Sequence, residues 1–305
     1  MVIKKVGVVG CGLMGHGIVQ VAAQGGFEVI ALEAEQKFLD SGLARIDKSL
    51  AKLAEKAAEK AVKEGKANEA DAKAKASADA AATRARIKGT TNKADLADCD
   101  LVIEAIVENL GVKNTLFAEL GKLCKPTTIF ASNTSSFPIG EMGDASGRPQ
   151  RMVGLHFFNP VQLMKLVEVV RTPKTADDVF ADAMAFGKAC GKAPVACKDT
   201  PGFVVNRLLV PYMVEAMKML ERGDASAEDI DTAMKFGCGY PMGPIELTDY
   251  VGLDTTLFIV EGWTKRYPND PSFQVPALLK KKVEEKKLGR KSGEGFYKWE
   301  GDKRV

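Results

Sequence analysis

Short apolar runs alternate with helix-like segments through the first two thirds of the chain. Residues 6–9 form a short apolar run typical of a buried parallel strand, residues 13–24 have helical spacing, and residues 27–32 indicate a second strand. The alternation continues with strand-like runs at residues 101–105, 128–131, 152–155 and 166–170, and with helices at residues 112–123 and 176–190. This order predicts an α/β fold with a Rossmann-like doubly wound sheet.

The last third of the chain has helical patterns only. Asp199, Thr200 and Pro201 have the composition of a helix start ahead of residues 203–222, with Gly223 as the stop. Ser226 with Asp229 resembles a capping box for the next helix. Further helices are expected at residues 244–250, 255–267 and 275–287. We therefore predict two domains, a Rossmann-like domain over residues 1–199 and an all-α C-terminal domain over residues 200–305.

One segment of the first domain departs from this alternation. Of the 32 residues from 51 to 82, 14 are Ala, and most of the others are Lys, Glu or Asp. These are good helix formers, and Gly65 with Asn68 marks a break. We expect a helical hairpin over about residues 41–86. Its sparse apolar stripe can bury little surface, so it should project from the core.

Composition narrows the class of protein. The 305 residues are 46% hydrophobic and 27% charged, which excludes general disorder. A net charge of +3 argues against a nucleic-acid-binding protein. No apolar run approaches the roughly 18–20 residues that span a bilayer, and a strand-like run begins too close to Met1 for a signal peptide. The six cysteines show no C-x-x-C pair and no zinc-like spacing, so we expect no metal site and a reducing, cytoplasmic location.

A glycine pattern between the first strand and the first helix predicts a dinucleotide site. The first glycine permits a tight turn, the second lets the backbone approach a pyrophosphate, and the third allows close packing of helix and strand. Glu33 ends the second strand, where a carboxylate accepts hydrogen bonds from an adenosine ribose and repels a 2′-phosphate. This favours NAD over NADP. The predicted cofactor-binding turn consists of Gly10, Cys11, Gly12, Leu13, Met14 and Gly15.

The chain has two histidines, and one of them follows a predicted strand. His16 lies just inside the first helix, where a surface or packing role is expected. His156 lies at a strand end, where open α/β sheets place ligands, and imidazole can accept a proton near neutral pH. Glu168 is a single carboxylate within an apolar strand, and a turn at Asn159 could return that strand beside His156. The pair would then form a base and its orienting carboxylate. The alternatives are a half-buried structural histidine and a solvent-facing glutamate.

Seven segments of the chain together form a specific set of motifs. They are VGVVGCGLMGHGI, VIEAIVENLGVKNTLF, ASNTSSFPI, GLHFFNPVQLMKLVEVV, DTPGFVVNRLLVPY, GCGYPMGPIELTDYVGLD and GRKSGEGFY. In their order and approximate spacing they resemble the L-3-hydroxyacyl-CoA dehydrogenase family, especially its bacterial 3-hydroxybutyryl-CoA members. Only the Ala/Lys-rich hairpin departs, being longer around residues 70–84.

The resemblance implies NAD-dependent oxidation of a 3-hydroxyacyl-CoA and assigns residues to roles. His156 would be the catalytic base, Glu168 its partner, and Ser135 and Asn206 would contact the substrate, with Ser135 near the nicotinamide. Further cofactor contacts would come from Glu108, Lys113, Asn159 and Lys291, and contacts to CoA from Ser49 and Lys56. Relatives of this kind form a homodimer through the helical domain.

The spacing of the lysines in the hairpin suggests a role that does not depend on the resemblance. Lys48, Lys52, Lys56 and Lys60 recur at every fourth position and so share a helix face, where lysine could bind the phosphates of CoA. We assign Lys52 and Lys56 to that contact. The alternative is a solvated helix face, because Glu55 and Glu59 lie close by.

Two rival functions remain open at this point. One is a two-domain 3-hydroxyacid dehydrogenase that acts on substrates without CoA and relies on a catalytic lysine. The other is a nonenzymatic, crystallin-like NAD-binding protein; the intact set of His156, Glu168, Ser135 and Asn206 argues against it.

Overall fold

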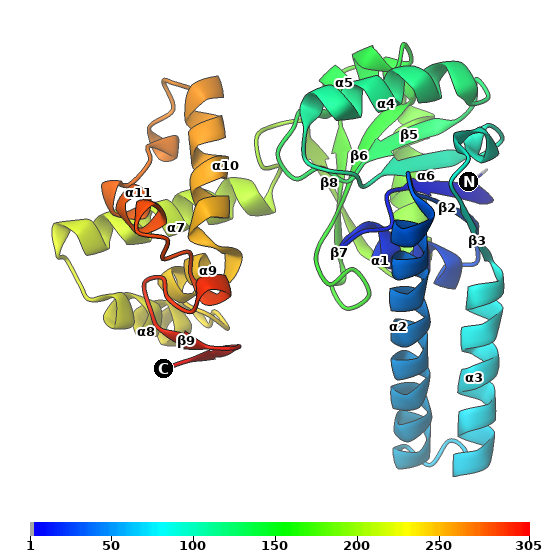
Figure 1. Cartoon of the computed structure of the whole chain (residues 1–305), viewed down its shortest axis with the longest axis horizontal. Coiled ribbons are helices and arrows are strands. Elements are labelled where there is room, and N and C mark those ends of the chain that lie inside the picture. The colour runs from blue at the N-terminus through cyan, green and yellow to red at the C-terminus, as the bar shows by residue number, and fades with distance from the viewer. Residues whose placement is uncertain (1–2) are drawn as a thin grey trace. The chain divides into compact units, whose positions relative to one another are not determined.

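The computed structural model describes residues 3–305, and the chain divides into two units, one ending at Phe203 and one spanning Val204–Val305 (Figure 1). The first unit contains an eight-stranded sheet in the order β3-β2-β1-β4-β5-β6-β7-β8. Strands β1 to β6 are parallel to their neighbours, β7 runs antiparallel to β6, and β8 is parallel to β7. The predicted doubly wound α/β sheet is confirmed. Its strands are β1 (Lys5–Val9), β2 (Glu28–Leu32), β3 (Ile87–Thr90), β4 (Leu101–Glu104), β5 (Ile129–Ser132), β6 (Met152–Phe157), β7 (Leu166–Arg171) and β8 (Ala193–Lys198).

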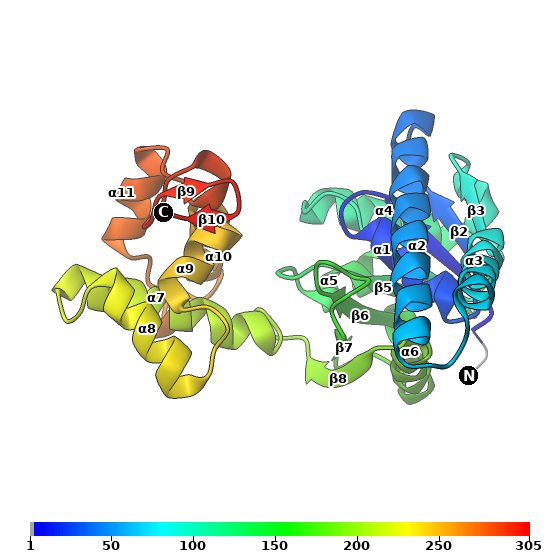
Figure 2. The same cartoon turned by 90° about the horizontal axis from the view of Figure 1, so that it is seen from below.

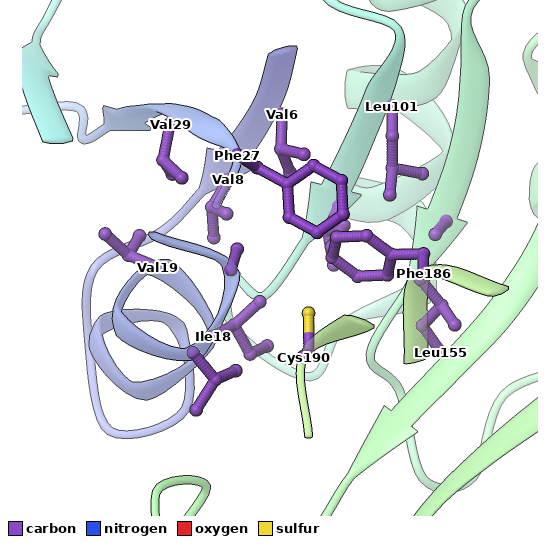
Figure 3. Close-up of a cluster of buried hydrophobic side chains, with 14 of the residues drawn as sticks. Val6, Val8, Ile18, Val19, Phe27, Val29, Leu101, Leu155, Phe186 and Cys190 are labelled. Atoms are coloured by element: carbon purple, nitrogen blue, oxygen red, sulfur yellow. The ribbon is translucent and has the colours of Figure 1, made fainter. Parts of the chain in front are cut away.

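Apolar clusters lie on both faces of this sheet. One joins the sheet to α1 (Gly15–Gln24) and α6 (Asp177–Ala189), and Figure 3 shows its central side chains. Phe27 and Phe186 pack there with ring centroids 5.0 Å apart. The other cluster joins the opposite face to α4 (Leu110–Leu123) and α5 (Ile139–Ala145). Because both faces are covered, the strands can be apolar along their whole length, as their sequence pattern indicates.

The Ala/Lys-rich segment forms the predicted helical hairpin, which extends away from the sheet (Figure 1). Its helices are α2 (Gln36–Lys63) and α3 (Glu69–Ala85). The break near Gly65 is confirmed, and Asn68 caps α3 by accepting a hydrogen bond from the Asp71 amide at 2.9 Å. Four of the five buried α2 residues lie between Leu39 and Leu50, and only Ala58 lies beyond them, so the outer part of the hairpin buries little.

The prediction of a helix start at Asp199 is wrong. The Asp199 carboxylate instead accepts hydrogen bonds from the amides of Ile139 and Gly140, at 3.0 and 2.8 Å, and so caps α5. The helix expected over residues 203–222 is nevertheless present as α7 (Val205–Arg222), which ends at Gly223. A capping side chain can come from a distant part of the chain, which local spacing does not reveal. The sequence pattern also missed β3, β8 and α5, which have four, six and seven residues.

The second unit is helical, with one small antiparallel strand pair that the sequence pattern did not predict. Ser226 caps α8 as expected, accepting a hydrogen bond from the Asp229 amide at 3.1 Å. Buried Asp249 accepts hydrogen bonds from the Phe296 and Tyr297 amides and from the Trp299 indole, and so fixes the chain that leads into the strand pair (Figure 2). The elements after α7 are α8 (Ala227–Cys238), α9 (Pro244–Val251), α10 (Leu253–Arg266), α11 (Ala277–Glu284), β9 (Trp299–Glu300) and β10 (Lys303–Arg304).

None of the helices within residues 3–305 combines the length and apolar character that a membrane crossing requires. The same residues contain no group of three or more His, Cys, Asp or Glu side chains arranged to hold a metal ion.

Candidate active site

The glycine turn between β1 and α1 has the shape that a dinucleotide requires. Gly10 has φ +95°, and a Cβ atom there would lie 2.5 Å from the carbonyl oxygen of Ala105. A Cβ atom on Gly15 would lie 1.8 Å from the carbonyl oxygen of Gly10, so only glycine lets α1 approach β1 this closely. A Cβ atom on Gly12 would meet no protein atom within 4 Å, so its backbone is open to a ligand.

Other residues of the turn face different surroundings. The Cys11 side chain is buried, and its sulfur would lie 2.5 Å from a Cβ atom on Gly42 of α2, so its backbone and not its thiol is presented to a ligand. Leu13 is exposed, whereas Met14 packs partly against the core. No side chain caps the start of α1, and its amides and dipole are therefore available to a pyrophosphate.

Glu33 lies at the carboxyl end of β2, beside the turn. Its Oε1 accepts a hydrogen bond from the Cys11 amide at 2.6 Å, and its Oε2 accepts one from the Ala34 amide at 3.2 Å. A cavity of about 390 Å³ opens beside it, lined by residues that include Gly10, Glu33 and Ile106. The carboxylate and the adjoining cavity fit the adenosine end of NAD.

His156 and Glu168 face each other across the antiparallel pair β6–β7. The Nδ1 atom of His156 lies 2.7 Å from Oε2 of Glu168, and both side chains are buried. The Phe158 and Phe203 rings pack against the imidazole, with centroids 4.5 and 5.7 Å from its own. The predicted return of the second strand beside His156 is confirmed. Since Glu168 engages Nδ1, the other ring nitrogen, Nε2, is left for a further contact. Its exchange of a proton with a substrate stays a prediction.

Ser135 lies in a loop whose other side chains are tied to the scaffold. Asn133, which follows β5, accepts a hydrogen bond from the Phe157 amide at 2.9 Å and so joins this loop to the residue next to His156. The hydroxyls of Thr134 and Ser136 both donate to Glu108. Within residues 3–305, no protein group is hydrogen-bonded to the Ser135 hydroxyl. Asn133 is not among the site residues predicted from the sequence, although a polar residue directly after a strand is a signal that could have identified it.

Lys113 and Glu108, both predicted cofactor contacts, interact with each other. The Lys113 side chain is 1% exposed, and its Nζ lies 2.5 Å from Oε1 of Glu104 and 3.1 Å from Oε2 of Glu108. Glu104 was not among the predicted site residues, although it ends β4 at the same edge of the sheet. Asn159 is exposed just after β6. A contact between the Lys113 ammonium and a cofactor stays a prediction.

Two predicted site residues belong to the second unit. Asn206 lies in the first turn of α7. Lys291 lies in a short helical turn, and its Nζ pairs with Asp254 at 2.5 Å. Their roles in the site stay predictions.

The four lysines of α2 have different surroundings. Lys48 and Lys52 line a groove of about 840 Å³ between α2 and α3, whereas Lys56 and Lys60 are exposed outside it. Each step of four residues turns the helix by about 40° beyond a full circle, so a run of four spreads around its surface. Ser49 is half-buried. The expectation that all four lysines form one face is therefore only partly right.

Comparison with known proteins identifies the family. The profile described as 3-hydroxyacyl-CoA dehydrogenase, NAD binding domain, matches residues 5–200, and the profile of the family's C-terminal domain matches residues 202–299. The chain is 51% identical to the human protein named hydroxyacyl-coenzyme A dehydrogenase, mitochondrial, over 98% of this chain and 92% of that one. It is 47% identical to a probable 3-hydroxybutyryl-CoA dehydrogenase of Deinococcus radiodurans, over 97% of this chain and all of that one.

A solved structure agrees with these matches. The (S)-3-hydroxybutyryl-CoA dehydrogenase of Ralstonia eutropha superposes with a TM-score of 0.87 at 38% identity, over 98% of this chain and 99% of that one. The dinucleotide turn, the Glu33 carboxylate and the adjoining cavity are what an NAD-binding domain requires. The chain therefore belongs to the 3-hydroxyacyl-CoA dehydrogenase family and is an NAD-dependent oxidoreductase.

Proposed function

We propose that this protein oxidises short-chain (S)-3-hydroxyacyl-CoA esters, with 3-hydroxybutyryl-CoA as the representative substrate, to 3-ketoacyl-CoA, and also catalyses the reverse reduction. The observation that carries the chemistry is the buried pair of His156 and Glu168 at 2.7 Å. The short acyl chain is supported by the names of the bacterial relatives.

In the proposed mechanism, Nε2 of His156 removes the proton of the 3-hydroxyl group. Glu168 holds Nδ1–H, fixes the tautomer and stabilises the imidazolium that forms. The cofactor, held at the glycine turn and at Glu33, would supply the hydride acceptor for C3. In the reverse direction the imidazolium returns its proton to the developing alkoxide. General acid–base catalysis of this kind contributes about 10²–10⁴-fold to a rate.

Ser135 and Asn206 complete the proposed polar set. The Ser135 hydroxyl is supported as a donor to the substrate oxygen because the side chains around it are already committed to other partners. The assignment of Asn206 is supported by its match to the family segment DTPGFVVNRLLVPY. Replacing Asn206 by Ala should lower kcat/KM for the acyl-CoA while leaving NADH affinity unchanged.

The CoA moiety is assigned to α2 through Ser49, Lys52 and Lys56. Lysine binds phosphate as a compact charge, and CoA carries a diphosphate and a 3′-phosphate. Neither Lys52 nor Lys56 has an ion-pair partner within residues 3–305, which leaves both ammonium groups available.

Chain-length profiling tests the substrate assignment. Purified protein is assayed by the loss of NADH absorbance with 3-ketoacyl-CoA substrates of increasing length, and with acetoacetate as the substrate that lacks CoA. We expect the highest kcat/KM with acetoacetyl-CoA and no turnover of acetoacetate. Efficient turnover of the free acid, or a strong preference for long chains, would contradict the proposal.

A homodimer through the helical unit is part of the proposal. Leu208, Phe236 and Phe258 of that unit are 70, 84 and 62% exposed, and such apolar side chains favour association. Light scattering on the purified protein should give twice the mass of the 32.8 kDa chain. Replacing Phe236 by Glu should shift the mass toward the monomer if this face is the interface.

A cytoplasmic location is also proposed. It is supported by six cysteines that are all free, as expected in a reducing compartment. Fractionation of the source cells with an antibody to this protein would test it, and recovery in a membrane or extracellular fraction would contradict it.

A further inference from the structure

Glu104 is a fully buried carboxylate at the ligand-binding edge of the sheet that has no role in the proposed chemistry. It is the last residue of β4 and is 0% exposed. A buried charge is retained only with close partners, and Glu104 has three of them. Its Oε1 accepts hydrogen bonds from Lys113 Nζ at 2.5 Å and from the Ile106 amide at 2.8 Å, and its Oε2 accepts one from the Ser132 hydroxyl at 2.5 Å.

These partners come from three different elements. Lys113 belongs to α4, Ile106 to the loop after β4, and Ser132 to the end of β5. The Lys113 ammonium also lies 3.1 Å from Glu108. One carboxylate therefore joins the ends of two strands to a helix and to the loop between them.

These contacts fix residues that precede and follow Ser135 in the chain. Ser132 is fixed by Glu104, while Thr134 and Ser136 are fixed by Glu108, which Lys113 in turn holds. Removing the Glu104 charge would weaken the hydrogen bond to Ser132, since an amide is a poorer acceptor than a carboxylate, and would leave Lys113 with Glu108 as its charged partner. The loop that carries the Ser135 hydroxyl would then lose its fixed position relative to β5.

We propose that Glu104 is a positioning residue that sets the place of the Ser135 hydroxyl through Ser132 and the Lys113–Glu108 pair. The inference rests on the role proposed above for Ser135. Glu104 touches neither substrate nor cofactor in this assignment. Its contribution is to the transition state, because a catalytic donor displaced by about 1 Å can lose about 10²-fold in rate while binding is largely retained.

A double-mutant cycle tests this inference. The variants are Glu104→Gln, Ser135→Ala and the two combined, each measured for kcat, KM for acetoacetyl-CoA, NADH affinity by fluorescence and melting temperature. We expect Glu104→Gln to lower kcat by about 10- to 100-fold with little change in NADH affinity. In the Ser135→Ala background the same change should have almost no further effect on kcat, because the group that it positions is gone.

Asp100→Asn is the matched control. Asp100 precedes the same strand at its opposite end and pairs with Lys125 at 2.6 Å, so the change removes an ion pair, more exposed than that of Glu104, from the other end of the strand. It should lower the melting temperature and leave kcat unchanged. Should Glu104→Gln fold poorly, Ser132→Ala replaces it in the cycle and removes one hydrogen bond of the same carboxylate.

The outcomes separate this inference from the proposed function. Independent, multiplicative losses of kcat in the double variant would overturn the role of Glu104 alone. A normal kcat in Glu104→Gln, or in Ser132→Ala where that variant is used instead, would also overturn the role of Glu104. Full kcat in Ser135→Ala would contradict the role of Ser135 in the proposed function and this inference with it.

Discussion

His156 on β6 and Glu168 on β7 are direct partners in an antiparallel register, with Nδ1 of the imidazole 2.7 Å from a carboxylate oxygen. Twelve positions separate them in the chain. The reversal of direction between β6 and β7, after six strands that run parallel to one another, is what brings a carboxylate beside the histidine at the edge where ligands bind.

From this contact we expect His156→Ala to lower kcat by about 10²–10⁴-fold. Glu168→Gln should lower kcat by a smaller factor, since the amide still contacts Nδ1 but no longer stabilises the imidazolium. NADH affinity, measured by fluorescence titration, should stay near that of the unmodified protein. Glu28→Gln, an exposed change at the start of β2, is the control. Near-full kcat in either site variant would refute the assigned roles.

The unmodified protein should strongly prefer NAD to NADP, because the Glu33 carboxylate would face a 2′-phosphate. In the double variant Glu33→Ser/Ala34→Arg, the repulsion is removed and a cation is added, so the ratio of kcat/KM values should move toward NADP. The variant should also lose some activity with NAD, since Glu33 holds the Cys11 amide at 2.6 Å. Equal kcat/KM for both cofactors in the unmodified protein would count against this reading of Glu33.

The double variant Lys52→Ala/Lys56→Ala should raise KM for acetoacetyl-CoA if these lysines bind the CoA phosphates. Both side chains are exposed, so the loss should be at or below about 1 kcal/mol for each contact and should shrink as salt is raised. A pantetheine substrate analogue without phosphates should be affected much less.

Lys66→Ala/Lys73→Ala provides the control for this prediction. It removes the same charge from the same hairpin, but at lysines that already pair with Glu64 and Glu69. An unchanged KM in the Lys52/Lys56 variant at low salt would mean that these lysines form a solvated helix face only.

The six thiols should differ sharply in reactivity. Burial raises the pKa of Cys11, Cys99, Cys190 and Cys197 to about 12 and that of Cys124 to about 11. Near neutral pH these groups stay protonated, and a thiol reagent attacks the thiolate. Cys238 is the exposed cysteine. Titration of the native protein with a chromogenic disulfide should show one fast thiol, absent in Cys238→Ser. Several fast thiols in that variant would contradict the buried assignments.

Asp199→Ala should destabilise the first unit by about 0.5–2 kcal/mol, because two amides at the start of α5 lose their acceptor. Asp199→Asn keeps one acceptor oxygen and should cost less. Denaturant unfolding of the three proteins measures the difference. If Asp199→Ala had the same free energy of unfolding as the unmodified protein, the capping contacts of Asp199 would contribute nothing to stability.

Much of the dinucleotide site could be predicted from the sequence because its signals are local. The spacing of Gly10, Gly12 and Gly15 reports backbone requirements within one turn, and Glu33 follows at the end of the next strand. The hairpin and its break near Gly65 could also be predicted, because helix propensity and capping act over a few residues.

The sequence by itself therefore determined the alternation of elements, the glycine turn and the candidate pair of His156 and Glu168. Only the tertiary structure decided what each buried polar group is bonded to. Asp199 caps a helix 60 residues away in the chain, and Glu104 reaches Ser132 across 28 positions. Desolvated charges must find partners wherever the fold brings donors together, and that proximity depends on strand order and not on sequence spacing.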